Sequence, residues 1–95
     1  MYATLAQIKQ ANKAAGFHFF SDRTMRFFAS RAGHTIYDGC LFVTSEQNIR
    51  DGQPRLYTIR RAMPDGSIET VGEFQQYATR KQAHAAAKAL AHAEW

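Results

Sequence analysis

Apolar residues recur at helical spacing in three parts of the chain, and a residue with capping chemistry precedes each part. We expect a first helix to begin after Thr4 and to end at Gly16, because glycine suits the left-handed position that follows a helix. A second helix is expected to begin after Ser21, and a third, rich in alanine, after Thr79. The helices predicted in this way occupy residues 5–15, 22–32 and 80–93.

The stretch between the second and third helices has strand and turn chemistry. Met63-Pro64-Asp65-Gly66 predicts a tight turn, since proline presets φ at its second position and glycine accepts a positive φ. Asp38-Gly39 has turn chemistry as well. The expected strands occupy residues 41–45, 55–62 and 67–74. The sequence therefore predicts one domain, residues 1–95, with an α+β fold in the order α-α-β-β-β-α: a three-stranded antiparallel meander with its helices packed on one face.

The turn at residues 63–66 also predicts a strand register. If Met63 faces Ser67, then Arg61 faces Glu69, Ile59 faces Val71 and Tyr57 faces Glu73. The opposite face then pairs Ala62 with Ile68, Thr58 with Gly72 and Leu56 with Phe74. We expect the face with Leu56, Ile68 and Phe74 to be buried. The other face would be left partly open as a secondary surface comprising Tyr57, Ile59 and Arg61.

The second helix carries an aromatic residue outside its apolar stripe. The stripe consists of Met25, Phe28, Ala29 and Ala32. Phe27 lies off it, among three arginines: Arg23, Arg26 and Arg31. Arginine binds phosphate or carboxylate groups and an exposed ring stacks on bases, so these four residues predict a docking face for an anionic or stacked partner. The alternative is that Phe27 packs beneath the apolar run 17–20 and leaves the arginines solvated.

Charge favours an anionic partner. The net charge is +4, and residues 1–61 carry nine Lys and Arg against four acidic residues. The composition excludes a disordered chain, because 45% hydrophobic residues are enough for a folded core. It also excludes a membrane-spanning protein, because no apolar run has the length of a membrane span. The single cysteine, Cys40, excludes an internal disulfide and fits a reducing cytoplasm. We expect a protein of the bacterial cytoplasm that contacts no membrane.

Catalytic and metal-binding signatures are missing from the sequence. His84 and His92 lie two helical turns apart with Lys88 between them, a spacing that does not suit metal ligation. Cys40 with His34 and Asp38 forms no recognised nucleophile motif, and a lone cysteine beside apolar residues usually packs as a small hydrophobe. We therefore expect no enzyme, no cofactor, no metal and no small-molecule substrate.

Several segments together resemble small proteins of unassigned function encoded on phages, prophages and plasmids. These segments are residues 17–31, 42–47, 57–61 and 65–75. The resemblance implies a mobile-element protein, a group that includes inhibitors of host defence such as anti-CRISPR proteins. Because this chain is basic, such an inhibitor would engage guide RNA, target DNA or an acidic patch. The prediction is a non-catalytic binding protein that docks on a nucleic acid or host nucleoprotein effector. The alternative is a protein–protein interaction module, or a homodimer, that uses the secondary surface.

Overall fold

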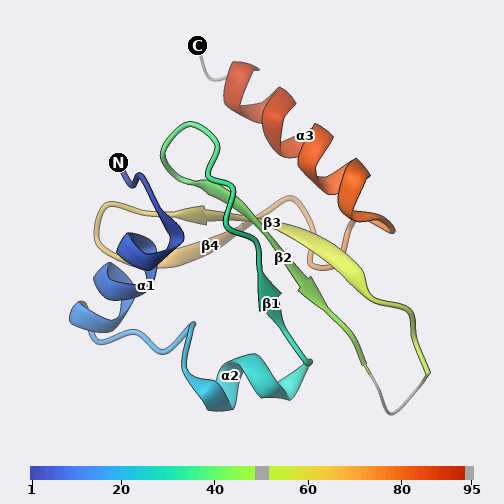
Figure 1. Cartoon of the computed structure of the whole chain (residues 1–95), viewed down its shortest axis with the longest axis horizontal. Coiled ribbons are helices and arrows are strands. Elements are labelled where there is room, and N and C mark those ends of the chain that lie inside the picture. The colour runs from blue at the N-terminus through green and yellow to red at the C-terminus, as the bar shows by residue number, and fades with distance from the viewer. Residues whose placement is uncertain (49–51, 94–95) are drawn as a thin grey trace.

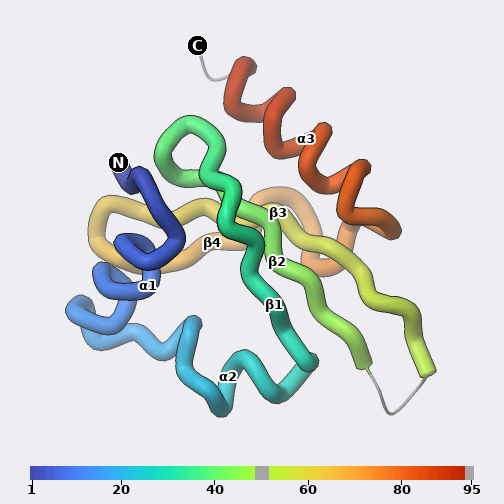
Figure 2. Tube along the Cα trace, in the orientation of Figure 1, coloured from blue at the N-terminus to red at the C-terminus, as the bar shows by residue number. Residues whose placement is uncertain are grey.

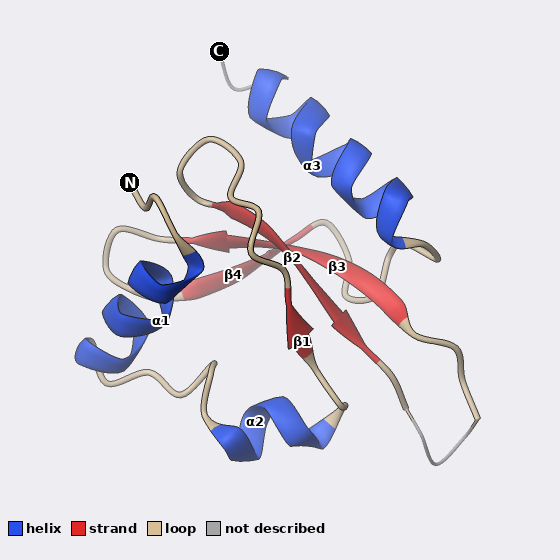
Figure 3. Cartoon of the chain, in the orientation of Figure 1, coloured by secondary structure: helices blue, strands red, loops and turns tan. Residues whose placement is uncertain are grey.

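The computed structural model describes residues 1–48 and 52–93, and it has the predicted α+β class with a four-stranded antiparallel sheet and three helices (Figures 1 and 3). None of the helices among these residues has the length and apolar character needed to cross a lipid bilayer. The elements in chain order are α1 (Leu5–Ala14), α2 (Asp22–Phe27), β1 (Arg31–Ala32), β2 (Leu41–Glu46), β3 (Leu56–Ala62), β4 (Ile68–Val71) and α3 (Arg80–Ala93).

The three helices begin where the sequence predicts. Thr4, Ser21 and Thr79 each accept, through the side-chain hydroxyl, a hydrogen bond from the backbone N–H three residues later, at 3.1–3.3 Å. These bonds satisfy N–H groups that have no partner within the helix. Gly16 ends the first helix with a φ of +86°, as expected.

The second helix is shorter than predicted. It ends at Phe27, because Ala29 adopts a left-handed φ of +46°. The Ser30 N–H donates to the Met25 carbonyl at 2.6 Å, and the Ala29 N–H donates to the Arg26 carbonyl at 3.2 Å. This pair of bonds is the Schellman ending, which usually has glycine at the left-handed position. An alanine there gives no sequence signal, so the prediction of a helix to residue 32 is wrong.

The chain that leaves α2 becomes an extra strand. Figure 2 shows it running directly from α2 into β1 at the edge of the sheet. Arg31 lies opposite Ser45 and Ala32 opposite Thr44, so β1 pairs with β2 and the strand order is β1-β2-β3-β4. The sheet therefore has four strands where the sequence predicted three.

The predicted register between β3 and β4 is confirmed near the turn. Ile59 lies opposite Val71, and Arg61 lies opposite Glu69. The Met63 N–H donates to the Ser67 carbonyl at 2.8 Å, which closes the turn as expected.

The pairing between β3 and β4 stops earlier than predicted. Strand β4 ends at Val71 and Gly72 follows with a φ of +77°. Tyr57 then pairs with Tyr77, through backbone hydrogen bonds of 2.8 and 3.0 Å, and not with Glu73. Phe74 is 46% exposed, so the expectation that it is buried opposite Leu56 is wrong.

The helices lie on both faces of the sheet, which corrects the prediction of one covered face. Helix α3 packs through Ala83, Ala87 and Ala91 on the face that carries Leu41, Val43 and Ile59. Helix α1 packs through Leu5 and Ile8 on the opposite face, where Phe42 and Ala62 lie. All six residues of β2 are buried, as expected for a central strand covered on both sides.

Candidate nucleic-acid interface

Helix α2 presents the predicted aromatic residue to solvent. The side chain of Phe27 is 77% exposed and contacts the edge of Phe28 at a ring-centroid distance of 4.5 Å. Arg23 and Arg26 are exposed on the same helix. The alternative, in which Phe27 packs beneath residues 17–20, is therefore wrong.

Arg31 is not on that helix. It is the first residue of β1 and is exposed at the sheet edge, so the predicted group of four residues spans a helix and a strand. Arg31 was expected on the helix with Phe27, but it instead lines a hollow whose floor includes residues of β2.

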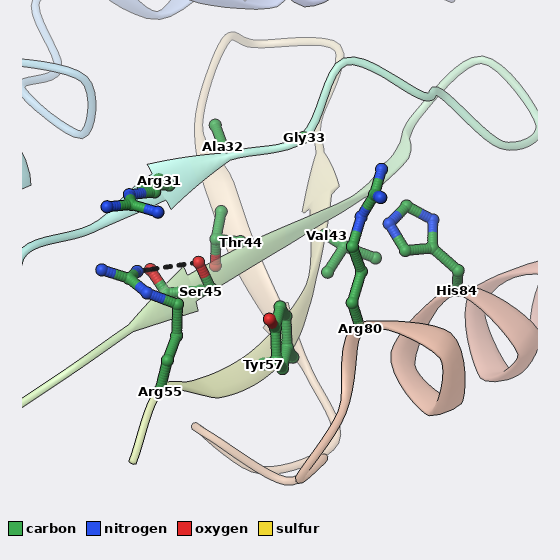
Figure 4. Close-up of a pocket in the computed structure, with 10 residues that line it drawn as sticks. All are labelled: Arg31, Ala32, Gly33, Val43, Thr44, Ser45, Arg55, Tyr57, Arg80 and His84. Carbon is green, nitrogen blue, oxygen red and sulfur yellow. Dashed lines mark hydrogen bonds between the residues drawn. The ribbon is translucent and has the colours of Figure 1, made fainter. Parts of the chain in front are cut away.

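This hollow, which we call the basic pocket, brings together basic side chains from three parts of the chain (Figure 4). Arg31 comes from β1, Arg55 lies just before β3, and Arg80 and His84 come from the first two turns of α3. The cavity volume is about 200 Å³. None of the described residues that line it is acidic; the others are Ala32, Gly33, Val43, Thr44, Ser45 and Tyr57.

The basic side chains form two groups within the pocket. Figure 4 shows Arg31 beside Arg55 at one end, Arg80 beside His84 at the other, and the Tyr57 ring between them. Arg55 Nη1 donates to the Ser45 carbonyl at 3.2 Å and to the Ser45 hydroxyl at 2.9 Å, which anchors the first group to β2.

Burial is the main influence on the charged groups at both ends of the pocket, and neighbouring positive charge adds to it. Partial burial lowers the pKa of Arg55, and repulsion from Arg31 lowers it further, while Tyr57 and Glu46 oppose the shift. Burial also lowers the pKa of His84, and the positive charge of Arg80 adds to this effect. The His84 ring is held by a 2.7 Å hydrogen bond between its Nδ1 and the Tyr37 hydroxyl. A bound anion would relieve the repulsion at each end.

Two shallower hollows extend the basic pocket toward α2. The first shares Arg31 and Arg55 with the pocket and is also lined by Arg26. The second shares Arg26 with the first and is also lined by Arg23 and Phe27. We call the whole path the arginine track; its arginines are Arg23, Arg26, Arg31, Arg55 and Arg80.

One carboxylate interrupts the track. Asp22 lies 3.9 Å from Arg26, and both side chains are more than 80% exposed. Such a solvated pair contributes little to stability, so Arg26 can exchange it for a phosphate. The predicted docking residues thus lie at one end of a longer cationic path.

Arg60 belongs to the opposite face of the sheet and has a structural role. Its guanidinium lies 3.6 Å from the buried carboxylate of Glu46 and stacks between the rings of Phe19 and Phe74, at 5.3 and 5.5 Å. Burial lowers the pKa of Arg60, while Glu46 opposes that shift. Arg60 is therefore held inside the fold and does not contribute to the track.

The predicted secondary surface is not an open face. Ile59 is fully buried beneath α3, Tyr57 lines the basic pocket, and Arg61 is half-buried beside a different hollow near Met63. The structure does not bring these three residues to one exposed surface. The open sheet face on which the alternative was based is therefore covered by α3, and a protein–protein interaction or homodimer stays a prediction that the structure does not test.

The sequence reasoning missed Arg55, Arg80 and His84 as site residues. Arg55 lies near Arg60 and Arg61 along the chain, and His84 was considered only as a metal ligand. Residues 31, 55 and 80 are about 25 positions apart, and only the packing of α3 on the face of the sheet brings them together. No motif spacing in the sequence links these positions.

Comparison with known proteins gives a family but no activity. No curated protein matches the sequence. No solved structure matches it either. A family model described as "Family of unknown function (DUF7447)" matches residues 4–88, which include every helix and strand except the last residues of α3. The chain therefore belongs to the DUF7447 family of unknown function.

Proposed function

We propose that this protein binds single-stranded nucleic acid along the arginine track, without catalysing a reaction. The observation that carries the proposal is the basic pocket: three arginines from separate parts of the chain line one cavity, and none of the described residues that line it is acidic. Arginine forms bidentate, charge-assisted hydrogen bonds to phosphate, and a row of arginines matches a sugar–phosphate backbone.

A single strand fits the track better than a duplex. Phe27 is exposed at one end and Tyr57 is half-buried in the pocket, so both rings are placed to stack on bases that are not paired. Duplex recognition commonly inserts a helix into the major groove. Helix α2 has six residues, which is short for that purpose.

Charge-matched variants test the proposal. Fluorescence anisotropy would measure the binding of RNA and DNA single strands of about 12 nucleotides, and of the matching duplex, since one binding module of this kind covers about 4–16 nucleotides. We expect Arg31→Gln/Arg55→Gln to weaken single-strand binding about tenfold or more, because two phosphate contacts are lost. Lys81→Gln/Lys88→Gln removes the same charge from exposed positions of α3 that line none of the hollows of the track, and should leave binding nearly unchanged.

Two results would reject the proposal. Equal losses of affinity in the two double variants would show that the strand is attracted by net charge alone. Failure of the wild-type protein to bind any strand would refute the proposed function. Thermal unfolding of each variant controls for loss of the fold. Docking on a CRISPR effector is a narrower prediction that rests on the sequence resemblance; adding purified effector–guide complexes to the same assay tests it.

A further inference from the structure

The two ends of the basic pocket differ in what lies beyond them. At the Arg31 and Arg55 end, the pocket continues into the next hollow of the track. At the other end, Arg80 and His84 project from α3 (Figure 4). Ala83 and Ala87 of this helix are fully buried against the sheet, so α3 lies close on it and bounds the pocket.

At the α3 end, His84 is held by its hydrogen bond to the Tyr37 hydroxyl, and Gly33 forms the adjoining wall. Arg80 is exposed beside them. A side chain at position 33 would place its Cβ 3.2 Å from the Val43 carbonyl oxygen and 4.0 Å from His84 Cε1. The backbone at Gly33, just after β1, therefore lies close to β2 and within ordinary contact distance of His84, and it forms the wall of this end of the pocket.

We propose that this closed end seats the terminal phosphate of a strand, a phosphomonoester, in preference to an internal phosphodiester. The inference rests on the proposed function: internal phosphates would lie along Arg55, Arg31 and Arg26, and the phosphorylated end would lie at Arg80 and His84. The track would thus bind a strand in one direction, from its phosphorylated end at α3 toward Phe27.

Charge favours a terminal phosphate at this place. A phosphomonoester carries about −1.5 to −2 charges near pH 7 and three free oxygens, whereas an internal phosphodiester carries one charge. Arg80 offers a planar fork of donors and His84 a second nitrogen, and the positive end of the α3 dipole lies beside them. These groups match the additional charge and the additional oxygen.

Size points the same way. A volume of about 200 Å³ is below the roughly 300–1,000 Å³ of pockets that enclose whole drug-sized ligands. The pocket therefore accommodates a phosphate and its adjoining sugar, with the rest of the strand leaving through the end next to Arg31.

The test compares strands that differ only at their ends. Single strands of one sequence would carry a 5′-phosphate, a 3′-phosphate or hydroxyl groups at both ends, and their affinities for wild type would be measured at constant salt. We expect one of the two phosphorylated strands to bind about tenfold tighter than the hydroxyl strand, as charge-assisted contacts of this kind allow. Arg80→Gln should abolish the difference, whereas Lys81→Gln, which changes a neighbouring exposed cation outside the pocket, should preserve it.

Each alternative outcome has a distinct meaning. Equal affinities for all three strands would overturn the terminal-phosphate seat and leave the proposed function standing. A preference that survives Arg80→Gln would also overturn the seat. Failure of every strand to bind would overturn both proposals.

Discussion

The arginine track makes a quantitative prediction about salt. Each phosphate that an arginine neutralises on a single strand releases counterions and contributes about −0.7 to the slope of log K against log salt concentration. The track has five arginines, so contacts by all of them predict a slope of about −3.5. Between about 50 and 200 mM salt, the affinity should then fall about 100-fold.

Single substitutions should change the slope or the affinity according to their place on the track. Arg55→Gln removes one contact inside the basic pocket and should flatten the slope by about 0.7. Asp22→Asn removes the carboxylate that lies 3.9 Å from Arg26; it should tighten binding without steepening the slope, because Arg26 is already counted among the five contacts. Lys88→Gln should leave the slope unchanged, because this exposed residue of α3 lines none of the hollows of the track.

The assay is a titration of labelled single strand at five or so salt concentrations for each variant. A wild-type slope near zero would refute the assignment of the track as a phosphate-binding path. So would a Lys88→Gln variant that flattens the slope as much as Arg55→Gln, because the effect would then reflect net charge and not position.

Three further predictions follow from individual side chains. Phe27→Ala should change the free energy of unfolding by no more than about 0.5 kcal/mol, since the ring is 77% exposed. The same substitution should weaken single-strand binding by about 1–3 kcal/mol, and an unchanged affinity would contradict the stacking role. Burial and the charge of Arg80 lower the pKa of His84, and the Tyr37 hydroxyl holds its ring in the pocket. The affinity for a hydroxyl-ended strand should therefore rise as pH falls below about 6.5, because protonation of His84 adds a positive charge at the end of the pocket opposite Arg31 and Arg55. His84→Gln should remove that rise; a rise that persists would assign it to another histidine. Gly66→Ala should destabilise the fold by about 3 kcal/mol, because φ is +90° and the new Cβ would lie 2.5 Å from the Ala11 carbonyl oxygen. Gly16→Ala has a similar φ of +86° but its Cβ would lie in open space, so this control should lower the free energy of unfolding by only about 1–2 kcal/mol. Melting curves that show equal losses for the two glycine variants would rule out the close approach of α1 to the β3–β4 turn.

Local chemistry accounts for the parts of the fold that were predicted correctly. The N-caps at Thr4, Ser21 and Thr79 bond to groups three residues away, and the turn at residues 63–66 sets the register of its own two strands. These features depend on neighbours along the chain, so the sequence alone determines them. The exposure of Phe27 followed in the same way from its place off the apolar stripe.

Tertiary structure decided where the helices lie and where the site is. Ala29 enters a left-handed conformation that alanine rarely adopts, so α2 ends early and Arg31 pairs with β2 as an edge strand. The apolar run of β2 buries both faces, which lets α3 cover Ile59 and carry Arg80 toward Arg31. Contacts between residues far apart in sequence are selected by packing and not by local propensity, and for that reason the charged groups of the basic pocket could be recognised only once the sheet and α3 were in place.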